Sequence, residues 1–368
     1  MRHTSSRSGR AGRASLALAL TSIIGLLVGS APVAAAGLAT VTIPSIGILV
    51  HGTCVDGRDY QAGGSVQVIQ KRGTTTLATK TFDIGSSSWT TCGFKAVLEG
   101  DKLQVAETVS ASVFSDRTVT VPTLTVSLHA STDSESGRVP TPGSLVNPGI
   151  DQMIAGLQGY SAAKGVNADV SGRFSVSWTG LVDIRAGDVA RMFWYDAEGD
   201  TFVITKATPS LSVEVGKSRI VVTGPYGPTT TAKLRTSKGV LRGTATGRVS
   251  GTHSELHATF KASGKAVKVR AGDKVTSSQI TGSYKVRASD LVVKKSGNGS
   301  LTATCAAGSD YGIFVNGVKT VGGRAGSGGK VSSTNLTNGM GPLFPGSSVK
   351  LACRLSSGFG QVFSRTVR

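Results

Sequence analysis

Apolar and polar residues alternate along most of this chain, in short runs that end at glycine-rich turns. In residues 267–271, two valines and an alanine alternate with a lysine and an arginine, and the same rhythm returns in many other places. Period-two alternation predicts β-strands with one buried and one exposed face. Long stretches with helical periodicity are missing, so the pattern predicts an all-β protein.

One stretch with this pattern occurs in four copies and organises the chain. The sequence Val-Asp-Ile-Arg-Ala-Gly-Asp-Val at 182–189 returns in similar form at 267–275, and weaker copies lie at 96–103 and 343–349. The copies lie roughly 80 residues apart, a period typical of an array of similar units. Gly-Asp between two apolar runs predicts a turn, because Gly reaches positive φ readily and Asp can bond to its own backbone. We therefore interpret the repeated aspartate as a turn former rather than a catalyst.

Residues 1–36 have the pattern of a secretory signal peptide. Arginines without any acidic residue precede an apolar run at 14–29, and small residues in an Ala-x-Ala arrangement follow as far as Ala36. The run is short for a membrane span, so cleavage after Ala36 is favoured over a retained membrane anchor.

The period and the turns predict four units after this leader, with short proline-containing joints between the first three. The predicted unit boundaries are 37–122, 123–208, 209–290 and 291–368. Within the second unit, apolar residues at 151–164 also fit helical spacing. The place of this segment in the repeat favours strands instead.

Units of ~80–90 residues, with about seven strands and a late Gly-Asp turn, resemble the immunoglobulin-like β-sandwich repeats of bacterial secreted and cell-surface proteins. The resemblance covers the whole mature chain. It implies a tandem array of immunoglobulin-like domains with a scaffold or binding role, and it transfers no functional residues.

The chain contains four cysteines, at Cys54, Cys92, Cys305 and Cys353. An even number of cysteines in an exported chain predicts disulfides. Three pairings are conceivable, and the unit boundaries favour Cys54 with Cys92 in the first unit and Cys305 with Cys353 in the fourth. A zinc or redox role is not favoured, since no Cys-x-x-Cys motif occurs.

Positive charge is concentrated in the C-terminal half. The formal net charge is +19; residues 209–290 hold fourteen basic and four acidic residues, and residues 291–368 hold nine and one. Such asymmetry favours contact with a polyanion, although solubility alone is an alternative explanation. The residues expected to contact the polyanion are Lys233, Arg235, Lys238, Arg242, Lys261, Lys265, Lys268 and Arg270.

Two short segments carry side chains of the kind that bind metals. His253, Glu255 and His257 share one face of a predicted strand and could offer two imidazoles and a carboxylate. Apolar residues take the opposite face, so a solvated strand face is the favoured interpretation. Residues 196–200 (Asp-Ala-Glu-Gly-Asp) resemble a loose calcium loop, but the flanking strands favour a hairpin turn. The sequence leaves calcium binding there open.

Three tryptophans, Trp89, Trp178 and Trp194, could form a platform for sugars. The first two occupy corresponding strands shortly before the repeated turn. A recurring place in the repeat favours a role in the core.

The sequence thus predicts a non-enzymatic exported scaffold or binding protein that needs no metal or cofactor. The favoured ligand is an acidic envelope or extracellular polymer, bound through the basic C-terminal half. The alternative is a protein-binding adhesin or structural spacer that uses strand edges. The expected location is secreted or extracellular, with non-covalent association with the cell surface.

Overall fold

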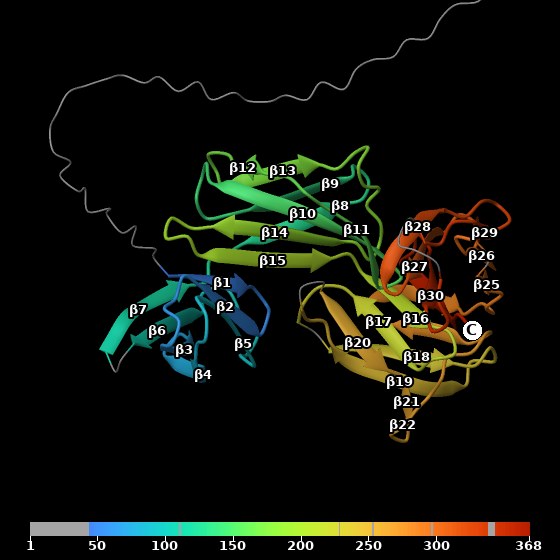
Figure 1. Cartoon of the computed structure of the whole chain (residues 1–368), viewed down its shortest axis with the longest axis horizontal. Coiled ribbons are helices and arrows are strands. Elements are labelled where there is room, and N and C mark those ends of the chain that lie inside the picture. Colours follow the sequence, from blue (N-terminus) through green and yellow to red (C-terminus); the bar gives the residue numbers. More distant parts are fainter. Residues whose placement is uncertain (1–43, 110–111, 228, 252–253, 296, 338–342) are drawn as a thin grey trace, which may run out of the picture. The chain divides into compact units, whose positions relative to one another are not determined.

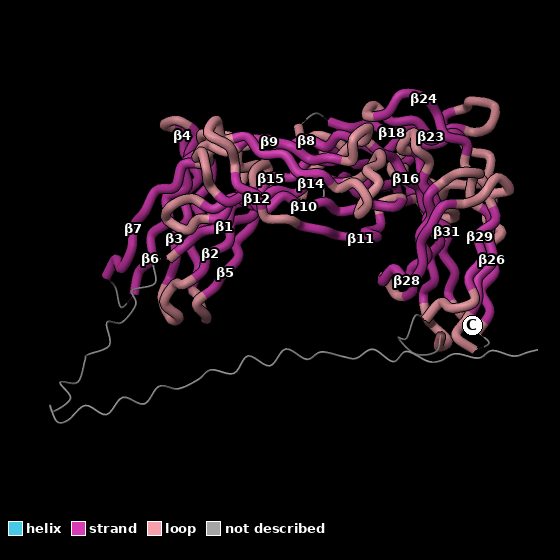
Figure 2. The backbone as a smooth tube through the Cα atoms, turned by 90° about the horizontal axis from the view of Figure 1, so that it is seen from above, coloured by secondary structure: helices cyan, strands magenta, loops and turns pink. Residues whose placement is uncertain are grey.

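The computed structural model describes residues 44–109, 112–227, 229–251, 254–295, 297–337 and 343–368, except for the side chains of 112–115 (Figure 1). Throughout this part the backbone forms strands and loops and no helix (Figure 2), which confirms the all-β prediction. Within it, therefore, no helix is long and apolar enough to cross a membrane. The predicted signal peptide, residues 1–36, lies outside the described residues.

One strand order occurs four times along the described chain. In each set of strands, the first, second and fifth strands form one layer, and the fourth, third, sixth and seventh form the other. The count omits three short strands that pair beside a layer: β12 (Val166–Asn167), β21 (Lys261–Ala262) and β22 (Lys265–Ala266). The array of similar units is therefore present, while the unit boundaries at 122, 208 and 290 stay a prediction.

The first two sets run from β1 to β15. The layers of the first set are β1 (Ser45–Leu49), β2 (Cys54–Arg58) and β5 (Ser88–Cys92), and β4 (Thr75–Asp83), β3 (Ser65–Arg72), β6 (Lys102–Val109) and β7 (Ser112–Thr120). The layers of the second set are β8 (Thr125–His129), β9 (Ser134–Arg138) and β13 (Arg173–Ser177), and β11 (Leu157–Ala163), β10 (Leu145–Ile154), β14 (Val189–Tyr195) and β15 (Thr201–Ala207). Residues 151–164 thus form two paired strands, as the repeat predicted, and not a helix.

The last two sets run from β16 to β31. The layers of the third set are β16 (Ser210–Glu214), β17 (Arg219–Thr223) and β20 (Glu255–Thr259), and β19 (Leu241–Arg248), β18 (Thr229–Arg235), β23 (Lys274–Ser277) and β24 (Ile280–Lys285). The layers of the fourth set are β25 (Val292–Lys294), β26 (Ser300–Thr304) and β29 (Lys330–Ser333), and β28 (Val318–Arg324), β27 (Asp310–Val315), β30 (Ser348–Arg354) and β31 (Phe359–Thr366).

Each set packs its two layers around an apolar core, as the third set illustrates. Leu211 and Ile220 of the smaller layer lie in one buried cluster with Leu234, Val275 and Tyr284 of the larger layer. The alternating pattern of the sequence produces this packing, because it gives every strand one apolar face.

Two parallel strand pairings join neighbouring sets into continuous sheets. β1 of the first set pairs with β15, the last strand of the second set, and the two lie side by side in Figure 1. β16 of the third set pairs in the same way with β31, the last strand of the fourth. The bonds that end the two pairings also match, since Val50 N–H donates to Val203 and Val215 N–H donates to Val362. The described chain therefore contains two copies of a larger arrangement, each made of two strand sets.

The four copies of the repeated turn share one pattern of main-chain hydrogen bonds. In each copy the glycine N–H donates to a carbonyl at the end of the set, at 2.8 to 3.1 Å: Gly100 to Val121, Gly187 to Thr208, Gly272 to Val286 and Gly346 to Val367. All four glycines have positive φ, between 79° and 96°. The turn favours glycine because other residues are strained in this conformation.

The residue after each glycine fastens the turn with its side chain. It accepts a hydrogen bond from the backbone N–H three residues earlier in all four copies, through Asp101, Asp188, Asp273 and Ser347. The three carboxylates are buried and each meets an arginine, namely Arg72, Arg354 and Arg242, respectively. These contacts use the carboxylate oxygens in the turn itself, which is the role predicted for the repeated aspartate.

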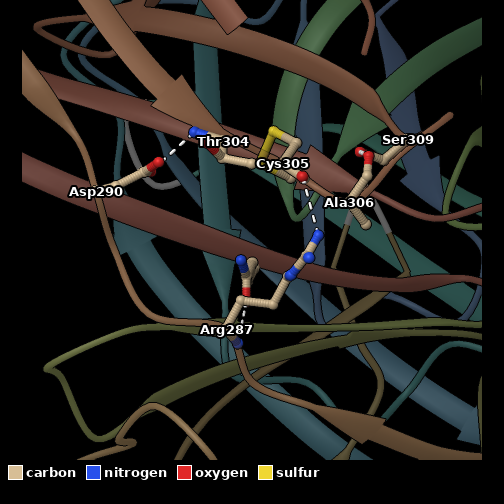
Figure 3. The surroundings of a disulfide bond; sticks show 8 residues. Arg287, Asp290, Thr304, Cys305, Ala306 and Ser309 are labelled. Atoms are coloured by element: carbon tan, nitrogen blue, oxygen red, sulfur yellow. Dashed lines mark hydrogen bonds between the residues drawn. A yellow bond between two sulfur atoms is a disulfide. The ribbon is translucent and has the colours of Figure 1, made fainter. Parts of the chain in front are cut away.

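Both expected disulfides form, and they connect different places. Cys54 and Cys92 lie directly opposite each other in neighbouring strands of one layer, with a Cα–Cα distance of 4.0 Å. Cys305, just after β26, reaches Cys353 in β30 and so joins the two layers of the fourth set. Figure 3 shows that Arg287 donates to the Cys305 carbonyl, so the disulfide region is also tied to the segment that precedes β25.

Candidate functional site

The larger layer of the third set concentrates positive charge. Its strands, in the order β22-β21-β19-β18-β23-β24, contain lysine and arginine but no acidic residue. The basic residues in these strands are Lys233, Arg235, Arg242, Arg248, Lys261, Lys265, Lys274 and Lys285. We term this layer the cationic sheet.

Strand alternation places the main cations on the face that points away from the core. In β18, Leu234 is buried between the two layers, and Lys233 and Arg235 on either side of it point the other way. Lys274 and Lys285 in the neighbouring strands follow the same rule and are exposed. The charge is therefore available to a ligand on one face of the sheet.

Strand register aligns three of these cations in a row. Arg235 of β18 lies opposite Lys274 of β23, and Lys274 lies opposite Lys285 of β24. None of the three forms an ion pair within the described part of the chain; the Arg235 guanidinium donates instead to the carbonyl of Gly239, at 2.9 Å. Like charges directly opposite each other destabilise a sheet. The row therefore lowers the stability of the layer that carries it.

A second row lies on the same face, two residues further along the strands from the first. Lys233 lies opposite Thr244 of β19 and Thr276 of β23, and Thr244 lies opposite Lys261 of β21. Lysine ammonium groups therefore alternate with threonine hydroxyls across the sheet. Both groups donate hydrogen bonds to anionic oxygens.

The structure divides the eight basic residues expected to bind the polyanion into three groups. Lys233, Arg235 and Lys261 lie in the two rows. Arg242 shares their face, but its guanidinium pairs with buried Asp273 and donates to the carbonyl of Lys268. The remaining four are exposed in turns and in the short β21–β22 hairpin beside the sheet: Lys238, Lys265, Lys268 and Arg270. That these residues bind a ligand stays a prediction.

Sequence reasoning missed Lys274 and Lys285, which complete the first row. Lys274 follows the third Gly-Asp turn directly and begins a strand of period two. That signal could have placed Lys274 on the exposed face. Its alignment with Arg235 could not be foreseen, because register between strands distant in sequence is fixed only in the fold.

A groove of about 360 Å³, partly open to solvent, lies beside β8 and the second half of β15. Its lining combines apolar and polar groups: His51, Glu99, Leu124, Thr125, Val126, Ser127, Ile204, Thr205, Lys206, Pro225 and Tyr226. The rings of His51 and Tyr226 lie with centroids 5.0 Å apart. Burial lowers the pKa of the His51 imidazole, and the nearby Glu99 carboxylate partly opposes this shift. The uncharged imidazole is therefore favoured in the groove.

A buried carboxyl group lies between the layers of the second set. Glu135 is fully buried, opposite Leu128 and Val176 in the neighbouring strands, and neither of its oxygens has a hydrogen-bond partner. Burial raises the pKa of Glu135 to about 9, partly opposed by the nearby indole of Trp178. The carboxyl is therefore neutral at neutral pH, and a substrate in solution has no access to it.

Residues 196–200 form a hairpin turn that uses its own carboxylates. One oxygen of Asp196 accepts hydrogen bonds from the N–H groups of Glu198 and Asp200. The Asp200 carboxylate binds the Ile46 N–H and the Arg117 guanidinium, which fixes the start of β1 against the turn. Burial raises the pKa of Asp200 to about 6. No group of three metal-ligating side chains occurs among the described residues.

The predicted strand face around His257 is only partly solvated, because the His257 side chain is 46% exposed and that of Glu255 is 10% exposed. Its ring contacts the Glu255 carboxylate at 2.8 Å and the Arg219 guanidinium at 2.9 Å, while Leu256 faces inward. His253 lies outside the described residues.

The tryptophans are core residues, since Trp89, Trp178 and Trp194 are all buried. The sequence-based preference for the core over a sugar platform is confirmed.

No family model and no curated protein matches this chain. Among solved structures, the tetra-tandem repeat in the extending region of a large adhesion protein is 14% identical, with a TM-score of 0.18, and the match covers 88% of this chain and 98% of that one. The BSP domain of a biofilm-associated protein is 8% identical, with a TM-score of 0.19 and coverage of 88% and 95%. A 1.5-MDa bacterial ice-binding adhesin is 12% identical, with a TM-score of 0.16 and coverage of 88% and 96%. At such TM-scores the likeness supports no conclusion about function.

Proposed function

We propose that this chain is a non-enzymatic, exported binding protein whose cationic sheet holds an acidic polymer of the cell envelope or the extracellular space. The observation that carries the proposal is the row of Arg235, Lys274 and Lys285. Three cations in directly opposed positions, without a carboxylate among them, lower the stability of the sheet. A ligand with repeated negative charges would relieve that repulsion.

A polymer fits the cationic sheet better than a small anion does. The cations are spread over several strands of one sheet face and are not gathered at one point. A chain of anionic groups can meet several of them at once and release its counterions, which makes the binding strong at low salt and weak at high salt.

The location in this proposal follows from the sequence and the cysteines. The leader pattern of residues 1–36 and the two disulfides both fit an oxidising, extracytoplasmic compartment. Polymer binding would then hold the protein non-covalently at the cell surface. The two-layer strand order that recurs four times supports an immunoglobulin-like assignment for the predicted units.

Retention on purified cell envelope tests the proposal. The four-threonine variant carries Lys233→Thr, Arg235→Thr, Lys274→Thr and Lys285→Thr. A matched control variant removes the same charge from the first set, through Lys71→Thr, Lys80→Thr, Lys95→Thr and Lys102→Thr. The mature wild-type chain and the control should be retained at low salt and released at high salt, and the four-threonine variant should not be retained. Equal retention of the two variants would contradict the proposal.

Two exposed aliphatic residues allow a lipid surface to be separated from a polymer. Val240 and Leu241, at the start of β19, are 63% and 49% exposed. Insertion into an anionic bilayer would need such apolar side chains, whereas polymer binding would not. Val240→Ser together with Leu241→Ser should therefore leave envelope retention unchanged. Loss of retention in this variant would assign the binding to lipid and contradict the polymer.

A further inference from the structure

The second set packs against the fourth set through the end that carries its repeated turn. We term the first and second sets the N-terminal pair and the third and fourth sets the C-terminal pair. Arg354 of β30 is buried, and its guanidinium donates to the carbonyl of Ala186 in that turn, at 3.2 Å, and to the Asp188 carboxylate. Arg185 of the same turn forms a salt bridge with Asp310 of β27, at 3.8 Å. This part of the internal contact is therefore charged.

The tip of the β10–β11 hairpin completes this contact. Ala155 and Gly156 form its two-residue turn, and both have positive φ, of 51° and 76°. Ile154 and Ala155 share a buried apolar cluster with Ala352 of β30 and Val362 of β31. The tip therefore covers the face of the C-terminal pair on which β16 joins β31, and a cavity of about 40 Å³ remains beneath it.

The N-terminal pair has an equivalent face, on which β1 joins β15. A cavity of about 240 Å³, partly open to solvent, lies at this place beside Leu49, Phe193 and Val203. No hairpin of the described residues covers it. We term this face of β10, β14, β15 and β1 the open face.

Strand register shows which residues of the open face correspond to the residues of the internal contact. Val203 and Val362 are equivalent, since their carbonyls accept the bonds that end the two parallel pairings. Phe193 lies opposite Val203, and Ala352 lies opposite Val362. Phe193 therefore takes the place of Ala352. The open face has the larger apolar side chain at this point.

The ion pair of the internal contact corresponds to two exposed apolar residues on the open face. Two residues further along β14 and β30, Tyr195 takes the place of Arg354. Asp310 lies opposite Arg354, and the register of β10 puts Leu145 at the corresponding place, next to Tyr195. Leu145 and Tyr195 are 52% and 44% exposed. The open face is thus apolar where the covered face is charged.

The fourth set ends in a turn that has changed in the same direction. In the second set, the Asp188 N–H donates to the carbonyl of Arg185. In the fourth set, the Ser347 N–H donates in the same way to Phe344, so Phe344 replaces Arg185 and Ser347 replaces Asp188. Phe344 is 63% exposed. The charged turn of the second set thus corresponds to an uncharged turn with an exposed aromatic ring.

The hairpins at these two turns differ in length, and the two faces differ to match. β10 continues for four residues beyond Ile150, to Ile154, whereas β27 ends at Val315, the equivalent of Ile150. A side chain at Gly360 would collide with the tip of the longer hairpin, and the open face has Thr201 at this place. The open face therefore suits the shorter β27–β28 hairpin better than the longer one.

We propose that copies of this chain associate head to tail, with the fourth repeated turn of one copy seated on the open face of the next. Phe344 of one copy would pack against Leu145 and Tyr195 of the other. Within one chain, Arg185 and Asp310 meet at the equivalent places. The two surfaces have therefore exchanged charge for apolar area together. Such a contact is heterologous, so it extends into a chain of copies unless its rotation closes a ring.

Sedimentation velocity of the full mature chain over a range of concentrations tests the proposal. The average mass should rise with concentration, and more steeply at high salt, because salt screens the repulsion between basic copies and an apolar contact persists. Phe344→Asp and Leu145→Asp should each weaken the association about 10- to 100-fold. The matched control Val240→Asp changes an equally exposed residue of the third set and should leave the association unchanged.

A mixture of the two weakened variants distinguishes a head-to-tail contact from a symmetric dimer. Phe344→Asp retains an intact open face, and Leu145→Asp retains an intact fourth turn. The equimolar mixture should therefore form a complex with one copy of each variant and stop there. The wild-type chain should form species larger than two copies under the same conditions.

Several results would overturn the proposal. These are a wild-type mass that stays at one copy at every concentration and salt, an association that stops at two copies, and an association that persists in Phe344→Asp. Two variants that remain separate in the mixture would also overturn it. Binding to dextran sulfate at low salt should persist in Phe344→Asp, which separates this test from that of the cationic sheet.

Discussion

The cationic sheet has a close counterpart in the first set, formed by β4, β3, β6 and β7, which we term the mixed-charge sheet. Both sheets have the same strand order and the same repeated turn. The turn carboxylate meets an arginine in both, through Asp101 with Arg72 and Asp273 with Arg242. The two sheets therefore show which features this architecture requires and which it can vary.

The difference between them is charge. At the places of Arg235, Lys274 and Lys285, the mixed-charge sheet has Lys71, Lys102 and Thr120. Lys71 also donates a hydrogen bond to Gln104, which in turn donates to the Asp116 carboxylate, so an acidic residue lies close to this row. The same fold forms with two opposed lysines and a threonine at these places, so it does not require the third cation of the row.

The largest expected effect concerns the feature that the sheets share. Asp101→Asn and Asp273→Asn should each lower the free energy of unfolding by about 2–4 kcal/mol, because each leaves an arginine beside a buried group without its charge. Asp273→Asn should have the larger effect, since the Arg242 side chain is 15% exposed and that of Arg72 is 45% exposed. Hydrogen-exchange mass spectrometry in urea reports each sheet separately. If only one of the two substitutions destabilised its own sheet, the two turns would not be equivalent.

The second prediction tests the difference in charge. Lys274→Glu should lower the affinity for dextran sulfate about 10- to 100-fold at low salt, because it removes a cation and places a carboxylate inside the row. Lys102→Glu makes the same change at the same place in the mixed-charge sheet and should alter the affinity by less than about threefold. Isothermal titration calorimetry with dextran sulfate measures the affinity of both variants. Similar losses would mean that total charge, rather than the cationic sheet, carries the binding.

The third prediction concerns the pH dependence of stability that the buried Glu135 causes, away from both charged sheets. Burial raises the pKa of Glu135 to about 9 in the folded chain, from the 4.5 that is usual for glutamate, so the folded state holds this proton more tightly than the unfolded state does. The stability that Glu135 contributes is therefore present in full below about pH 4.5 and is lost progressively as the pH rises toward 9.

Glu135→Gln removes this titration and provides the control. The melting temperature of the wild type should fall between pH 5 and pH 9, and that of Glu135→Gln should fall less. The difference between the two falls should reach a few degrees at about pH 9. Scanning calorimetry at three pH values measures both. Parallel curves for the two proteins would refute the assignment to Glu135.

The smallest expected effect is a gain in stability. Lys285→Thr installs the residue that the mixed-charge sheet has at the equivalent place and removes the repulsion from Lys274. The free energy of unfolding of the cationic sheet should rise by a few tenths of a kcal/mol, while the affinity for dextran sulfate falls. The same exchange experiment in urea measures the first quantity. A lower free energy of unfolding in Lys285→Thr would show that repulsion within the row does not destabilise the sheet.

The sequence could predict the elements of this fold because they follow from local patterns. Period-two alternation located β3 and β4 and the strands around the Gly-Asp turns, and the repeat favoured strands over a helix at 151–164. The pairing of Cys54 with Cys92 followed from the unit boundaries. In each case the relevant information lies within one unit.

What the sequence could not predict depends on contacts between distant segments. The parallel pairings of β1 with β15 and of β16 with β31 join different units, and no local pattern encodes them. The salt bridge that removes Arg242 from the free cations depends on the turn at Asp273. Composition located the basic half correctly, but only the register showed which cations lie opposite one another.

The most direct test of the central claim is the salt dependence of binding to dextran sulfate. The logarithm of the association constant should fall steeply with the logarithm of the salt concentration for the mature wild-type chain and for the matched control variant. The four-threonine variant should show both a lower affinity and a much shallower slope, because it lacks the cations that release counterions. Equal slopes for the four-threonine variant and the wild type would contradict the claim that the cationic sheet binds an acidic polymer.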